Sequence, residues 1–237
     1  MQKLTGIKAA FIDIDNMLLD FDAYVQETMR TGFAHFGLKP YTPDMFEVFT
    51  RENNVLWRRI EDGTLVFEEL VKIRWRNIFQ ALGIEADGPA FERYFREALN
   101  ESAIPVPGAH ALLQELHGRM IVCAASNGPY MQQIHRLELG EMEQYMDYCF
   151  ISEKIGASKP AGLFYERAFR ELNEGRETPI RPEETVMIGD SKTSDIRGGA
   201  GFGMHTIWYD RSGKADPASC EAEYTVTSLE EIPLLIE

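Results

Sequence analysis

Two kinds of hydrophobic pattern follow one another along the chain. The short run Ala9–Ile12 is wholly apolar, which predicts a buried parallel strand. From residue 20 to about 99, apolar residues recur every three or four positions, as on the buried faces of helices. After Pro105-Val-Pro-Gly108, short apolar runs alternate with helical stretches. This order predicts an α/β fold, a doubly wound parallel sheet of the Rossmann type, with an all-helical domain inserted after the first strand.

Turn and cap residues place the boundaries of the helices in the insertion. Thr42-Pro43 resembles a helix start, with an N-cap followed by proline, and Gly37 and Gly83 are typical of helix ends. The expected helices cover 20–37, 43–59, 67–82 and 87–99. We therefore assign 18–104 to a helical domain, and 1–17 with 105–237 to the α/β core domain.

The alternation beyond residue 105 predicts the remaining elements of the core. Strands are expected at 9–12, 120–125, 148–151, 185–188, 205–208 and 224–226. Helices are expected at 109–117, 129–138, 161–172 and from about 194.

Polar residues follow the strands that should lie at the centre of the sheet. Because the carboxyl ends of parallel strands meet at one edge, these residues are expected to lie close together. They are Asp13 and Asp15 after the first strand, Ser126-Asn127-Gly128 after the second, Ser158-Lys159 after the third, and Asp190-Ser191 with Asp195 after the fourth.

Each of these groups has a structural alternative when taken alone. Asp15-Asn16 and Ser126-Asn-Gly are common in turns, Lys159 could be a solvated charge, and Asp190-Ser191 could cap a helix. Together they predict a magnesium and phosphate site. Hard oxygen ligands suit Mg²⁺, the cation offsets the repulsion among the aspartates, and a lysine attracts a phosphoryl oxygen.

Composition and charge narrow the classes of partner. The 237 residues carry a net charge of −14, which argues against a nucleic acid polymer or an anionic membrane. No apolar run approaches the ~20 residues of a membrane span, and the N-terminus lacks the pattern of a secretory signal. Cys123, Cys149 and Cys220 lack metal-ligand spacing, so we expect reduced thiols in a cytoplasmic protein.

These motifs resemble those of the haloacid dehalogenase-like (HAD) hydrolase superfamily. Four motifs occur in the family's order: the paired aspartates Asp13 and Asp15, a strand ending in Ser126, the lysine of Ser158-Lys159-Pro160, and GDSKTSD from Gly189 to Asp195. The resemblance covers nearly the whole chain. It implies that the helical insertion is a C1-type cap that closes over the site and selects the leaving group. In having an acid at position 15, the chain resembles the phosphatase branch of the family, because the true dehalogenases lack an acid there.

The resemblance also implies a role for each site residue. Asp13 would be the nucleophile and Asp15 the general acid and base. Mg²⁺ would be held by the side chains of Asp13 and Asp190 and by the backbone carbonyl of Asp15. The transferring phosphoryl oxygens would be bound by Ser126, Lys159 and the backbone N–H of Asn127, of which Ser126 and Lys159 also count as catalytic. Asp195 would orient Lys159 or a metal-bound water.

A narrower resemblance is to bacterial pyrimidine 5′-nucleotidases. It is carried by FIDIDNMLLDFD, by NNVLWRRIEDGTLVFEELVKIRW and LGIEAD in the helical insertion, and by SEKIGASKP and GDSKTSDIRGG. It implies a monomer or homodimer that hydrolyses a small phosphorylated metabolite, with a nucleoside 5′-monophosphate as the leading expectation. A phosphatase of sugar phosphates, a mutase and a catalytically silent binding protein stay open as alternatives.

Met17 and the aromatic residues of the insertion carry further expectations. Met17 replaces the Thr or Ser that the family has two residues after the second aspartate, so we expect weakened activity or compensation by a neighbour such as Asn16. Among the aromatic residues of the insertion, Trp75 lies on an apolar helical stripe and is expected in the core, whereas Trp57 is the better candidate for a substrate contact. The full aromatic set is Tyr24, Phe46, Phe49, Trp57 and Trp75.

Overall fold

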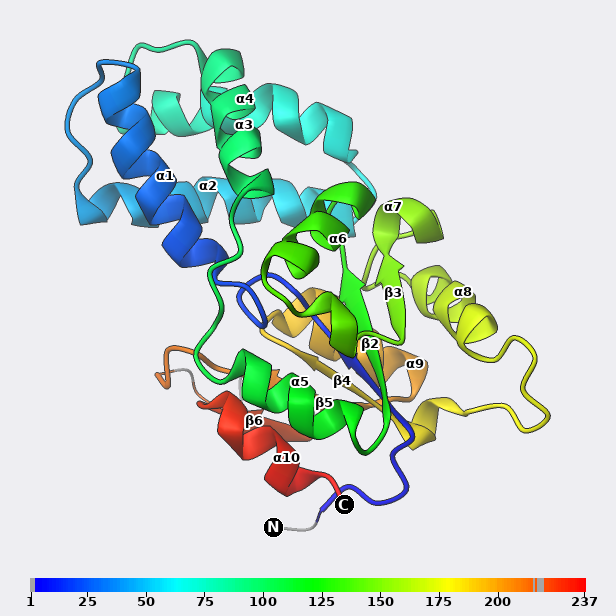
Figure 1. Cartoon of the computed structure of the whole chain (residues 1–237). Coiled ribbons are helices and arrows are strands. Elements are labelled where there is room, and N and C mark those ends of the chain that lie inside the picture. Colours follow the sequence, from blue (N-terminus) through cyan, green and yellow to red (C-terminus); the bar gives the residue numbers. More distant parts are fainter. Residues whose placement is uncertain (1–2, 215, 217–219) are drawn as a thin grey trace. The chain divides into compact units, whose positions relative to one another are not determined.

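The computed structural model describes residues 3–214, 216 and 220–237 (Figure 1). Their contacts divide the chain into two compact units. The core unit comprises the chain up to Asp20 together with Ala103–Glu237, and the helical unit is Phe21–Ser102. Leu18 and Leu19 belong to the core unit and are fully buried in its apolar cluster.

A six-stranded parallel sheet forms the centre of the core unit, in the order β3-β2-β1-β4-β5-β6. This confirms the predicted doubly wound α/β fold. The chain reverses its direction of travel across the sheet between β1 and β4, which is where such folds place their sites. The strands are β1 (Ala9–Ile12), β2 (Ile121–Ser126), β3 (Tyr148–Ile151), β4 (Thr185–Gly189), β5 (His205–Tyr209) and β6 (Tyr224–Val226).

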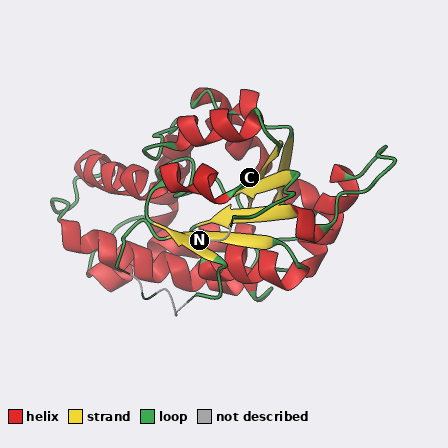
Figure 2. Ribbon diagram, turned by 90° about the horizontal axis from the view of Figure 1, so that it is seen from below, coloured by secondary structure: helices red, strands yellow, loops and turns green. Residues whose placement is uncertain are grey.

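Helices cover both faces of this sheet (Figure 2). Alternate side chains of β1 point to opposite faces: Ala10 and Ile12 belong to one apolar cluster, and Ala9 and Phe11 belong to the other. The helices of the core unit are α5 (Ala109–His117), α6 (Tyr130–Leu139), α7 (Ser152–Ile155), α8 (Gly162–Leu172), α9 (Gly198–Phe202) and α10 (Ile232–Leu235). Residues of α5, α6 and α10 pack in the first cluster, and residues of α7 and α8 pack in the second.

Three features of the core unit differ from the sequence expectation. The single-turn helices α7 and α10 were not predicted, because four residues are too few to show a 3.6-residue period. The helix expected from about 194 begins at Lys192 with a π-helical segment, η3 (Lys192–Arg197), which leads into α9. Its N-cap is Ser191, whose side chain accepts a hydrogen bond from the Ser194 N–H.

The helical unit contains α1 (Phe21–His35), α2 (Pro43–Glu61), α3 (Phe67–Leu82) and α4 (Gly88–Asn100). Thr42 occupies the N-cap of α2, but its side chain makes no capping hydrogen bond. Asp87 does cap α4, by accepting from the Ala90 N–H at 2.9 Å. Trp75 lies in the aromatic core of the unit, as expected, with its ring 4.2 Å from that of Phe91.

Two observations bear on the remaining sequence expectations. All three cysteines carry free thiols. Within the part of the chain that the structure describes, no helix has both the length and the apolar character needed to cross a bilayer.

Candidate active site

The first motif lies where β1 ends, beside β4. The backbone N–H of Asp13 continues the pairing by donating to the Ile188 carbonyl at 2.9 Å. The chain then closes a tight loop, in which Asn16 adopts a left-handed conformation (φ 61°) and its N–H donates to the Leu19 carbonyl. Asp15 lies within this loop, and its side chain is 34% exposed. The loop therefore presents an accessible carboxylate two residues after a buried one.

Lys159 connects the first motif to the last. Its side chain is 1% exposed, and its Nζ donates to Asp13 Oδ1 at 2.6 Å, to Asp195 Oδ1 at 2.7 Å and to the Ala125 carbonyl at 2.5 Å. An ammonium group has three donors, so all three are used. A phosphoryl oxygen would therefore have to share or replace one of these contacts.

The charges around Lys159 change the protonation of the site. Burial raises the pKa of the Asp13 carboxyl to about 7; the charge of Lys159 opposes this shift and that of Asp195 adds to it. Burial alone would lower the pKa of Lys159, but Asp13 and Asp195 outweigh it and raise that pKa above its ordinary value. Lys159 is thus held as a cation, whereas Asp13 is pulled towards its neutral form until another positive charge is present.

Three carboxylates form a set of oxygen ligands that can hold a metal cation. Asp13, Asp190 and Asp195 each offer an oxygen, and these oxygens all lie within 4.8 Å of one another. This donor set fits Mg²⁺, which prefers hard oxygen ligands.

Both carboxylate oxygens of Asp195 have partners within the site. Oδ1 accepts from Lys159, and Oδ2 accepts from the Ser191 N–H at 3.0 Å. Asp195 thus contacts both Lys159 and the backbone at the start of η3. Gly189 is required beside it, since a Cβ at that position would lie 2.2 Å from Asp195 Oδ2.

Ser126 and Asn127 lie at the carboxyl end of β2, next to β1 in the sheet. The Asn127 side chain forms two hydrogen bonds with the backbone of Lys159, donating at 2.9 Å and accepting at 2.8 Å. It thereby ties the second motif to the third. The Ser126 hydroxyl oxygen accepts from the Gly128 N–H and from the Gln133 amide, which leaves its proton for an incoming oxygen.

Sequence reasoning missed two residues that contact Asp15. Arg136 donates to Asp15 Oδ1 and Gln133 donates to Asp15 Oδ2, each at 2.7 Å. Both side chains belong to α6 and are 1% exposed. A signal existed, because these polar residues lie on the same face of the helix as the buried Leu137.

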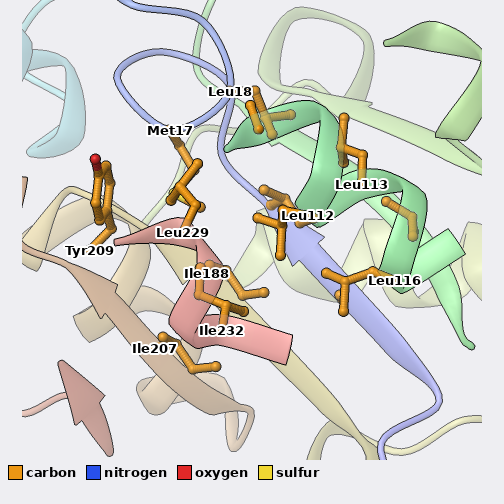
Figure 3. Packing of buried hydrophobic residues seen from close by; sticks show 14 of the residues in the cluster. Met17, Leu18, Leu112, Leu113, Leu116, Ile188, Ile207, Tyr209, Leu229 and Ile232 are labelled. Atoms are coloured by element: carbon orange, nitrogen blue, oxygen red, sulfur yellow. The ribbon is translucent and has the colours of Figure 1, made fainter. Parts of the chain in front are cut away.

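Met17 is fully buried in the first apolar cluster of the core unit, near Leu229 and Tyr209 (Figure 3). The loop that carries the aspartates is held instead by its backbone: the N–H groups of Leu18 and Leu19 both donate to the Ile14 carbonyl at 2.9 Å. These main-chain bonds do not depend on the side chain at position 17.

We expect Met17→Thr to destabilise the protein while changing its turnover little. Truncating a buried Met to a smaller polar residue should lower the free energy of unfolding by about 2–4 kcal/mol. Urea denaturation and steady-state phosphate release measure the two effects separately. A rise in turnover of about tenfold or more, equivalent to ~1.4 kcal/mol of barrier, would show instead that Met17 weakens catalysis.

The model of the haloacid dehalogenase-like hydrolases matches residues 7–203 of this chain. The chain belongs to this family. The family model spans all four motifs, from the strand before Asp13 to the segment after Asp195. The protein is therefore a hydrolase of this family, and its relatives include nucleotidases and phosphatases.

Relatives and a solved structure extend the comparison over nearly the full length. The pyrimidine 5′-nucleotidase PynA of Streptococcus pneumoniae is 30% identical, covering 95% of this chain and 93% of its own. The pyrimidine 5′-nucleotidase YjjG of Escherichia coli is 27% identical, covering 95% and 96%. The structure of the HAD-hydrolase YfnB of Bacillus subtilis, bound to magnesium, has a TM-score of 0.83 at 28% identity, covering 98% and 97%.

Proposed function

We propose that the protein is a Mg²⁺-dependent phosphomonoesterase whose substrates are nucleoside 5′-monophosphates, with a preference for pyrimidines. The observation that carries the proposal is the buried Lys159, which joins the carboxylates of Asp13 and Asp195 beside Asp190. A site with three carboxylates and one lysine suits a divalent cation and a phosphoryl group together. The names of PynA and YjjG support the nucleotide as the substrate class.

The proposed reaction has two steps. A carboxylate oxygen of Asp13 attacks the phosphorus in line, forming an O–P bond while the ester O–P bond breaks, and the electron pair leaves with the alcohol oxygen. Asp15 gives its proton to that oxygen. In the second step Asp15 takes a proton from water, whose oxygen attacks the phosphorus of the aspartyl-phosphate and releases inorganic phosphate and Asp13.

The remaining residues bind and orient the phosphoryl group. The Ser126 hydroxyl and the Asn127 N–H would donate to its oxygens, and Lys159 would stabilise the negative charge that they carry. Asp13 and Asp190, with the backbone carbonyl of Asp15, would hold Mg²⁺. The ion would neutralise charge on the phosphoryl oxygens and favour the ionised, nucleophilic form of Asp13.

We further propose that the helical unit is the cap that selects the leaving group. Trp57 stays the candidate for a substrate contact in that unit. Its ring lies 6.1 Å from that of Phe67, and it packs at the edge of a small cluster formed by Leu56, Leu65 and Leu70. The protein would act on a small metabolite as a monomer or homodimer.

A panel of phosphomonoesters tests the proposed function directly. We expect Mg²⁺-dependent phosphate release from pyrimidine nucleoside monophosphates, with a lower kcat/KM for purine nucleotides and for sugar phosphates. A preference for sugar phosphates would retain the chemistry and overturn the nucleotide assignment. No release from any ester, by a folded protein that binds Mg²⁺ in calorimetry, would support a silent binding protein. The matched control is Glu177→Gln, an exposed position of the core unit between α8 and β4, which should not alter the profile.

A further inference from the structure

We propose that Gln133 and Arg136 are positioning residues that fix the Asp15 carboxylate in the orientation needed to protonate the leaving oxygen. The inference rests on the proposed function, in which Asp15 is the acid and base. It adds two residues from α6 that none of the four sequence motifs contains.

The contacts fix both ends of the Asp15 carboxylate. Oδ1 accepts from Arg136 and Oδ2 accepts from Gln133, each at 2.7 Å. A carboxylate held by one donor can still rotate about its terminal bond, whereas two donors on different oxygens define its plane. Asp15 is the partly exposed member of this group, and its two partners are almost fully buried.

Arg136 also determines which way the Gln133 amide faces. The Arg136 guanidinium is a donor only, and it lies 2.9 Å from Gln133 Oε1. The oxygen of the amide must therefore face Arg136, and Nε2 must face the acceptors on the other side. Those acceptors are Asp15 Oδ2 and the Ser126 hydroxyl oxygen, both at 2.7 Å. One amide thus links the proton donor to the phosphate-binding hydroxyl.

The backbone around Gln133 is shaped for this contact. A Cβ at Gly128 would lie 2.7 Å from Gln133 Nε2, so only glycine leaves room for the amide at this point. Gly128 therefore has a packing reason beyond its place in the turn after β2.

A buried arginine that served only the fold would be expected to pair with a buried carboxylate. The helical unit contains such a pair: Arg74 bonds Glu92 at 2.5 Å, and both side chains are about equally buried. Arg136 also pairs with a carboxylate, but with that of Asp15, whose side chain is 34% exposed. Burying a guanidinium is costly, so a pairing with a solvent-accessible carboxylate indicates a functional use.

This arrangement predicts an effect that depends on the leaving group. A basic alkoxide, such as that of a nucleoside, needs a proton as the ester bond breaks, whereas a nitrophenolate leaves without one. A misplaced Asp15 should therefore slow alkyl ester cleavage much more than aryl ester cleavage. A loss of general stability would slow both equally.

The test compares Gln133→Met and Arg136→Met with the wild-type protein, using a nucleoside monophosphate and 4-nitrophenyl phosphate. The rate measured is release of the leaving group in the first turnover, which precedes hydrolysis of the aspartyl-phosphate. We expect the nucleotide rate to fall by about 10²-fold and the aryl rate by less than about fivefold. Arg136→Lys retains a charged donor and should therefore restore part of the nucleotide rate relative to the aryl ester rate.

Arg74→Met is the matched control, because it removes a buried arginine of the helical unit. It should lower stability and leave the ratio of the two rates unchanged. Equal slowing of both esters by folded Gln133→Met protein would overturn the proposal. If Arg136→Met does not fold, Gln133→Met and Arg136→Lys still test the proposal. Failure of the wild-type protein to cleave any ester would instead overturn the proposed function.

Discussion

Asp13→Asn is expected to abolish phosphate release while leaving the protein folded. The amide has the shape of the carboxylic acid but lacks the anionic oxygen that attacks phosphorus, and losses of about 10⁴-fold or more are typical when such a nucleophile is removed. Phosphate release and circular dichroism measure the two properties. Turnover within about tenfold of wild type, a barrier difference of only ~1.4 kcal/mol, would rule out Asp13 as the nucleophile.

The same substitution should stabilise the protein when Mg²⁺ is absent. The pKa of Asp13 in the folded protein is about 7, against an ordinary value of 3.8. The protonated Asp13 carboxyl therefore contributes fully to the free energy of unfolding below about pH 4, and this contribution is lost as the pH rises through about 7. Asn resembles the protonated form, so the free energy of unfolding near neutral pH should exceed that of wild type by about 1–3 kcal/mol. Urea denaturation on either side of this window, with the exposed Glu177→Gln as the control, measures the difference.

Lys159→Met should remove activity and also destabilise the fold. The substitution leaves the carboxylates of Asp13 and Asp195 buried without their shared cation. Breaking one partner out of a buried ion pair typically costs about 3–5 kcal/mol. Turnover should fall by at least about 10²–10³-fold, because the charge that stabilises the phosphoryl oxygens is also lost.

Magnesium binding provides an internal check on the prediction for Lys159→Met. Because a bound cation can offset the two carboxylates, Mg²⁺ should raise the unfolding midpoint of Lys159→Met more than that of wild type. Lys159→Arg keeps the charge, but a planar guanidinium does not match three acceptors arranged around one nitrogen, so it should recover stability only in part. A Lys159→Met protein with wild-type stability would show that the buried carboxylates are not held as an ion pair with this lysine.

The sequence by itself determined the strands, the order of the motifs and the position of the helical insertion. Each of these depends on local patterns. A wholly apolar run as short as Ala9–Ile12 favours a buried strand, because a buried helix would need a longer run, and periods of three to four residues predict helices whatever their partners are. Gly83 and Asp87 marked helix ends for the same reason, since caps act within one turn.

Only the tertiary structure decided how the site is held together. The bonds from Gln133 and Arg136 to Asp15 join residues 118 and 121 positions apart, and the bond from Lys159 to Asp13 spans 146. No local pattern reports a contact between residues so distant. A lysine, a glutamine or an arginine in the sequence is compatible with a solvent-exposed position or with a place in an active site. The fold determines which, by setting how deeply each side chain is buried and which acceptors surround it.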